Sequence, residues 1–66
     1  MSLGGWYAEK REAESEYYAK RINHETYERR TRFAIGMIYK CGDEDGARRM
    51  ARAHGYNIEE LIQEVN

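Results

Sequence analysis

A chain of 66 residues forms one domain, and a domain of this size buries only about 60% of the surface that its unfolded chain exposes. Eleven basic side chains nearly balance twelve acidic ones, for a formal net charge of −1, which argues against a protein held on nucleic acid mainly by charge. The single cysteine permits neither an internal disulfide nor a zinc site built on thiolates, and no apolar run reaches the length of a membrane span or a signal-peptide core. We therefore expect a cytoplasmic protein with a thin hydrophobic core.

The N-terminal part of the chain predicts a helix over about residues 5–22. There is no proline in the chain and no glycine between Trp6 and Ile35, so nothing there forces the backbone out of a helix. Residues 1–5 are expected to be disordered or to derive from the expression vector, which leaves a single helical domain over residues 6–66. Apolar side chains of the first helix include Trp6, Ala13 and Tyr17.

A break or kink is expected at Asn23 and His24. Asn23 is a favourable N-cap residue, and the apolar stripe of the first helix is out of phase with the stripe that follows. The alternative is one continuous helix of roughly 54 Å at 1.5 Å per residue, which the short C-terminal helices could not cover and which would need a second chain.

The densest helical pattern spans residues 25–41, and we expect the rest of the chain to pack around it. Its apolar residues recur at alternating steps of four and three: Tyr27, Thr31, Ala34, Ile38 and Cys41, with Ile35 widening the stripe. Phe33 and Met37 lie to one side, so more than one neighbour is required. Cys41, as the last member of the stripe, is expected to be a buried and inert thiol.

Pairs of an acid and a base one helical turn apart are expected to stabilise the solvated faces of these helices. The acid precedes the base in each, which is the better orientation and contributes about 0.2–0.5 kcal/mol per pair. The three pairs are Glu16 with Lys20, Glu25 with Arg29, and Glu28 with Arg32.

Two short helices are predicted after Gly42, over about residues 45–54 and 58–65. Gly42 and Gly55 are typical helix-ending residues, and the acidic residues 43–45 can cap the helix that follows them. Asn57 and Glu60 stand at capping-box spacing, and Tyr56 and Leu61 at hydrophobic-staple spacing. The fold class is therefore all-α: a small bundle of three to four helices, with a long N-terminal helix or helix pair and a C-terminal hairpin of short helices.

The C-terminal hairpin resembles three known helical arrangements without matching any of them. Ala51, followed four residues later by Gly55, is similar to the start of a DNA-binding helix-turn-helix. That motif prefers an apolar residue where this chain has His54, and the helix that would enter the groove carries three glutamates. Gly55-Tyr56-Asn57 also resembles the first loop of ubiquitin-associated domains, but the chain ends before their third helix. The glycine-aromatic turn before an acidic helix is also similar to the tail of Nif11-type leader segments. We assign the chain to none of these families.

No residue constellation predicts catalysis. Cys41 would need a histidine beside it, for which only His54 is a candidate, and His24 with Glu28 offers two metal ligands without a third. There is no glycine-rich phosphate loop, nucleophile elbow or calcium loop. We expect a protein that is not an enzyme and that uses no cofactor, metal or small-molecule substrate.

The arginines and aromatic residues are the remaining candidates for function. They predict a regulatory protein that binds another protein, or itself as a homodimer, because tyrosine, tryptophan and arginine are typical interface anchors. The alternative is a small nucleic-acid-binding regulator with a helix-turn-helix-like hairpin. In a purely structural interpretation, the arginines pair with nearby acids and the tyrosines cover the thin core. The candidate partner-binding residues are Trp6, Tyr17, Tyr18, Arg29, Arg30, Phe33, Arg48, Arg49 and Arg52.

Overall fold

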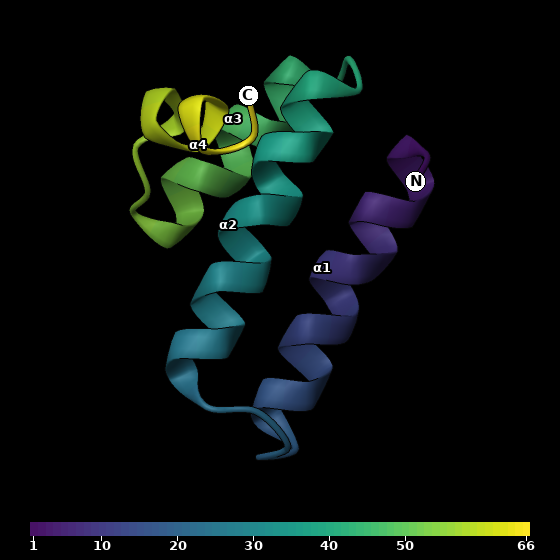
Figure 1. Cartoon of the computed structure of the whole chain (residues 1–66), viewed down its shortest axis with the longest axis vertical. Coiled ribbons are helices and arrows are strands. Elements are labelled where there is room, and N and C mark those ends of the chain that lie inside the picture. The colour runs from purple at the N-terminus through teal and green to yellow at the C-terminus, as the bar shows by residue number, and fades with distance from the viewer.

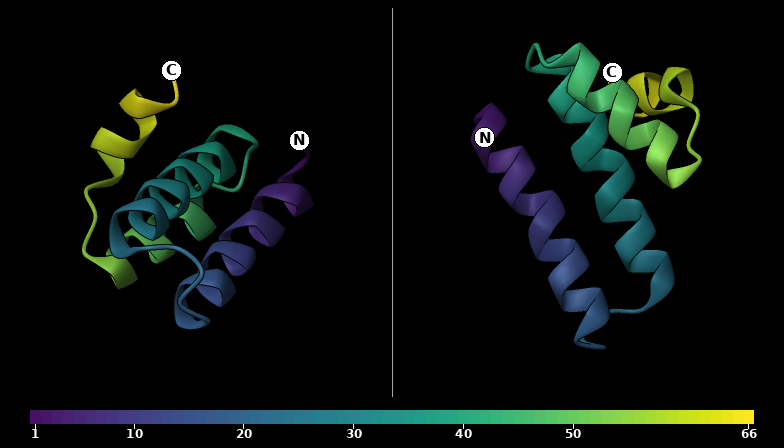
Figure 2. Two further views of the ribbon diagram at one scale, coloured as in Figure 1. Left: turned by 60° about the horizontal axis from the view of Figure 1, so that its bottom comes forward. Right: turned by 180° about the vertical axis from the view of Figure 1, so that it is seen from behind.

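The chain folds into four helices, which a computed structural model describes over all residues 1–66 (Figure 1). The helices are α1 (Leu3–Tyr18), α2 (His24–Lys40), α3 (Glu44–His54) and α4 (Ile58–Glu64). The central helix α2 contacts each of the other three, and the backbone of α1 comes close to α2 only. Seen from behind in Figure 2, α3 crosses over α2 on the side opposite to the one shown in Figure 1. The predicted all-α bundle is confirmed.

Each helix begins at a side chain that accepts a hydrogen bond from the backbone of its first turn. Asn23 accepts from the backbone nitrogen of Thr26 at 2.8 Å, which confirms the predicted break before α2. Asp43 accepts from Gly46 at 2.9 Å at the start of α3. Asn57 caps α4 as predicted, but its oxygen binds the backbone nitrogen of Glu59, one position before the expected partner.

The first helix differs from its predicted bounds at both ends. It begins at Leu3, with the Ser2 hydroxyl accepting from the backbone of Gly5, so residues 3–5 are helical although they were expected outside the helical domain. It ends at Tyr18, four residues earlier than predicted, because Lys20 adopts a left-handed conformation with φ of 61° that turns the chain toward α2.

The end of α2 corrects the expected position of Cys41. The helix stops at Lys40, and Cys41 is its C-cap residue, followed by Gly42 with φ of 111°. The apolar stripe therefore does not continue into Cys41. Its side chain is exposed rather than buried.

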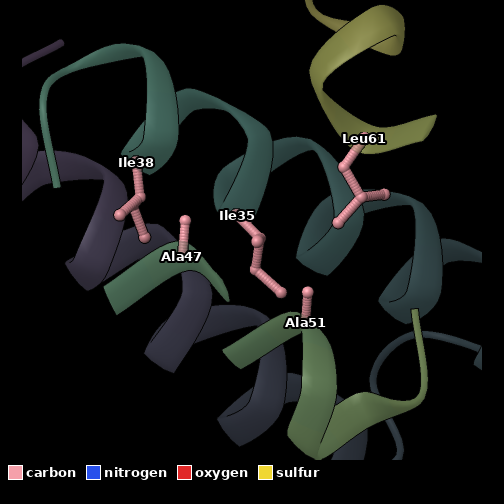
Figure 3. Packing of buried hydrophobic residues seen from close by; sticks show 5 residues of the cluster. All are labelled: Ile35, Ile38, Ala47, Ala51 and Leu61. Carbon is pink, nitrogen blue, oxygen red and sulfur yellow. The ribbon is translucent and has the colours of Figure 1, made fainter. Parts of the chain in front are cut away.

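The hydrophobic core lies between α2 and the two C-terminal helices. Its members are at most 1% exposed: Ile35, Ile38, Ala47, Ala51 and Leu61 (Figure 3). Alanines on α3 allow that helix to approach the isoleucines of α2 closely, and Leu61 of α4 points toward the same cluster. Only 11 of the 66 residues are buried in total, which confirms the thin core.

Gly36 sets the distance between α2 and α4. A Cβ atom at this position would lie 2.7 Å from Cγ1 of Val65 and 2.9 Å from the carbonyl oxygen of Leu61. A larger residue would therefore push the two helices apart.

The radius of gyration is 11.1 Å, close to the value of about 10.8 Å expected for a compact domain of this length. The continuous-helix alternative is excluded by this shape and by the turn before Asn23.

Candidate functional site

Phe33 lies on the side of α2 that α3 does not cover. Phe33 stands two residues before Ile35, so the two side chains point about 200° apart around the helix, since successive residues are about 100° apart. Ile35 faces the core. The ring of Phe33 meets Trp6 of α1 edge to face, with centroids 5.4 Å apart and an interplanar angle of 69°. Even so, 43% of Phe33 is exposed, which is unusual for so large an apolar side chain in this molecule.

Trp6 is held more deeply than Phe33. It packs against the edge of the hydrophobic core, and its indole nitrogen is buried without a hydrogen-bond partner. Trp6 is therefore held in place by packing, and it supports Phe33 from the α1 side.

Arg30 ties α1 to α2 beside these aromatic rings. Its guanidinium donates to Glu9 at 2.8 Å and to Glu16 at 3.0 Å, both on α1. These two bonds, that to Glu9 first, raise the pKa of Arg30 above its ordinary value. The charge of Arg30 is therefore neutralised within the molecule, and the side chain is a structural bridge.

Arg29 is different, because no carboxylate lies within ion-pair distance of its guanidinium. The three pairs expected one helical turn apart, including Glu25 with Arg29, do not form. Glu16 instead reaches Arg30, and Arg32 reaches α4. Arg29 remains an exposed cation directly beside Phe33.

Arg32 joins α2 to α4 on the other flank of Phe33. It donates to Glu64 and lies 3.7 Å from Glu60, and these carboxylates, the bond to Glu64 foremost, raise the pKa of Arg32. Its guanidinium carbon also lies 5.2 Å from the centre of the Tyr56 ring.

Two hollows flank Phe33 and share it with Arg29. The first is lined by Trp6, Glu9, Arg29, Arg30 and Phe33. The second is lined by Glu25, Glu28, Arg29, Arg32, Phe33 and Glu64. We call the residues of these two hollows the Phe33 face. It is built by α1, α2 and α4, with no contribution from α3, and it combines an apolar ridge with a rim of both charges.

The α3 arginines lie apart from this face. Arg48 lies 5.4 Å from the centre of the Tyr39 ring and 3.7 Å from Glu59, while Arg49 and Arg52 are exposed. Arg48 and Arg52 line a separate hollow with Tyr56. The candidate arginines of α2 and α3 therefore line separate hollows, although Arg32 and the α3 arginines both lie near Tyr56.

Tyr17 and Tyr18 lie at the closed end of the α1–α2 hairpin. Tyr17 stacks on the buried Tyr27, with centroids 4.4 Å apart, and its hydroxyl oxygen is 3.3 Å from Nδ1 of His24. Burial raises the pKa of Tyr27. Tyr18 is 75% exposed beside Lys20. Tyr17 is thus a packing residue, and Tyr18 is exposed but lines neither hollow of the Phe33 face.

A polar contact that sequence reasoning missed joins α1 to the start of α3. The Tyr7 hydroxyl donates to the Asp43 carboxylate, which also caps α3. This bond raises the pKa of Tyr7 and, together with the bond from the Gly46 backbone, lowers the pKa of Asp43. Tyr7 and Asp43 are 36 positions apart in the sequence, and no local sequence pattern indicates a contact over that separation.

Cys41 and His54 lie toward opposite ends of α3. Cys41 precedes α3 and His54 ends it, so the eleven-residue helix, about 16 Å long, separates them. His54 stacks on Tyr56, with centroids 5.3 Å apart, and burial followed by the charge of Lys10 lowers its pKa. No three histidine, cysteine, aspartate or glutamate side chains are grouped so that they could hold a metal ion.

Comparisons with protein-family models, with curated proteins and with solved structures each find no match to this chain. None of the four helices combines the length and the apolar character needed to cross a membrane. The Phe33 face is therefore the feature from which a function can be argued.

Proposed function

We propose that this is a cytoplasmic, non-catalytic regulatory protein that acts by binding another protein through the Phe33 face. The observation that carries the proposal is Phe33 itself, which stays 43% exposed on α2 although it is packed against Trp6 and lies beside the unpaired Arg29. Aromatic side chains and arginine are the residue types that most often dominate the binding energy of protein interfaces.

The Phe33 face is also pre-organised for binding. Trp6 holds one edge of Phe33, and Arg30 is fixed by its bonds to Glu9 and Glu16. A partner would therefore order few side chains on this surface, which lowers the entropic cost of association, about 0.5–1.5 kcal/mol for each flexible side chain fixed.

The nucleic-acid alternative finds less support in the charges. Glutamates line the exposed side of α4, where a helix-turn-helix would meet a phosphate-lined groove: Glu59, Glu60 and Glu64. Arg48 of α3 lies near Glu59 and Tyr39, so part of the neighbouring positive charge is already balanced.

The test uses a photo-reactive benzoyl-phenylalanine incorporated at Phe33 in the cells that make the protein. We expect illumination to join the protein to one discrete protein species. The matched control carries the same group at Tyr18, which is 75% exposed and lies off the Phe33 face, and should give no such product. The product from position 33 should also disappear when Arg29→Glu is added. Equal and diffuse labelling from both positions would contradict the proposal.

A further inference from the structure

The size of the Phe33 face bears on the identity of its partner. The helices that supply most of its residues, α1 and α2, lie side by side in Figure 1. A stable interface of standard size buries about 800 Å² on each partner, about one fifth of the 4284 Å² that this chain exposes. A protein partner would therefore have to cover both hollows of the Phe33 face rather than one.

The charges on the Phe33 face favour a partner with the same mixture of charges. Three arginines and four glutamates line the two hollows around one aromatic ridge. A strongly acidic partner would meet the glutamates, and a strongly basic one would meet the arginines. A surface that carries both signs around an apolar centre can complement a second copy of itself across a two-fold axis.

The net charge removes the usual obstacle to self-association. With a formal charge of −1, two copies repel each other very weakly at a distance. Within the face, Arg29 and Glu25 are both exposed and neither forms an ion pair in the single chain. In a two-fold symmetric dimer, Arg29 of each chain can pair with Glu25 of the other chain. One unpaired cation and one unpaired carboxylate per chain then give two intermolecular ion pairs.

We infer that the partner of the Phe33 face is a second copy of this chain, giving a two-fold symmetric dimer with Phe33 and Trp6 at its centre. This inference rests on the proposed function and specifies its partner. Because the exposed apolar area of this face is small, we expect the dimer to form at micromolar to millimolar rather than nanomolar concentration.

The experiment measures mass and Trp6 accessibility in the same dilution series of the full chain. Sedimentation velocity should show the mass rising from 7.8 kDa to twice that value. Trp6 is the only tryptophan, so its quenching by acrylamide reports on this face alone, and quenching should fall as the dimer forms.

Two variants locate the interface. Phe33→Glu should weaken dimerisation by at least about tenfold, because it places a charge in the dehydrated centre. Arg29→Glu should weaken dimerisation several-fold. It alters only an exposed, unpaired residue, so it still tests the inference if Phe33→Glu fails to fold. Tyr18→Glu, outside the face, should leave the dissociation constant unchanged. Circular dichroism checks that each variant remains helical.

Two results would overturn the inference. A mass of 7.8 kDa at every concentration would show that no dimer forms, and the photo-product at position 33 would then identify a different protein, leaving the proposed function intact. A dimer that leaves Trp6 quenching unchanged, or that resists both Phe33→Glu and Arg29→Glu, would place the dimer interface elsewhere on the molecule.

Discussion

The two sides of α2 are held by different kinds of contact. Toward α3 and α4 the contacts are aliphatic and almost fully dehydrated, with Ile35, Ile38 and Leu61 at 0% exposure. Toward α1 they are aromatic stacks and charge-assisted hydrogen bonds, such as those that Arg30 donates. We call these the aliphatic side and the polar side. The aliphatic side should set the stability of the fold, and the polar side should make the attachment of α1 sensitive to pH and salt.

The largest effect is expected from Leu61→Ala on the aliphatic side. Leu61 is fully buried at the contact of α4 with the core, and removing such a side chain costs about 2–5 kcal/mol. A domain of this length has roughly 3–5 kcal/mol in total, so the variant should be largely unfolded in water. Urea denaturation followed by circular dichroism measures it. Tyr18→Ala, at a 75% exposed residue, should shift the unfolding free energy by no more than about 0.5 kcal/mol. Equal losses of unfolding free energy in Leu61→Ala and Tyr18→Ala would contradict the idea that the aliphatic side sets the stability of the fold.

Gly36→Ala tests how closely the aliphatic side is packed. Alanine favours a helix over glycine by up to about 1 kcal/mol, yet its Cβ would lie 2.9 Å from the backbone oxygen of Leu61. We expect a net loss of about 1–3 kcal/mol, measured by thermal denaturation. The matched control is Gly4→Ala in α1, where the nearest atom to a new Cβ is 4.0 Å away and stability should be unchanged or slightly higher. A more stable Gly36→Ala variant would show that α4 can move away at little cost.

Arg30→Met tests the polar side while keeping the apolar stem of the side chain. Glu9 and Glu16 lose their shared cation, and all three side chains are about one quarter exposed, so we expect a loss of about 1–2 kcal/mol. The loss should shrink in 1 M salt, where the Debye length is about 3 Å. Arg29→Met, with no ion pair to remove, is the control and should leave stability unchanged. A loss that is equal at low and high salt would indicate packing rather than charge.

The smallest effect is expected from Tyr7→Phe and depends on pH. The Tyr7 hydroxyl lowers the pKa of Asp43, so this contact stabilises the fold at pH above the ordinary pKa of aspartate, and the stabilisation is lost as pH falls through the lowered pKa. Wild type should therefore melt at a higher temperature than Tyr7→Phe near neutral pH, and the difference should vanish at strongly acidic pH. Tyr18→Phe, whose hydroxyl is exposed, should show no difference at any pH. A constant difference between wild type and Tyr7→Phe across the titration would exclude Asp43 as the cause.

The helices could be predicted well, because the residues that begin and end each helix act on the backbone next to them. Asn23, Asp43 and Asn57 cap the helices that follow, and Gly42 and Gly55 adopt the left-handed conformation that ends a helix. The exceptions have physical reasons. Lysine has no preference for the left-handed region, so the early end of α1 at Lys20 could not be anticipated.

The residue types of the candidate site could be predicted from the sequence, but the ion-pair partners of its arginines could not. Trp6, Arg29, Arg30 and Phe33 do lie together as residues of one face. Their pairing was not visible, because Arg30 binds carboxylates 14 and 21 residues away in place of one a turn away. Which arginine stays free depends on how the helices dock, and the sequence pattern of a single helix does not contain that information.

The central position of α2 has a further consequence for the motions of the molecule. Because the backbone of α1 approaches α2 alone, an opening of α1 would break its contacts with α2, the packing of Trp6 on the core and the Tyr7–Asp43 bond, and would leave α3 and α4 packed on α2. Such an opening costs less free energy than global unfolding, so amide protons of α1 should exchange with solvent faster than those in the middle of α2. It would also separate Trp6 from Phe33, so a movement about the turn at residues 19–23 would assemble or dismantle the Phe33 face.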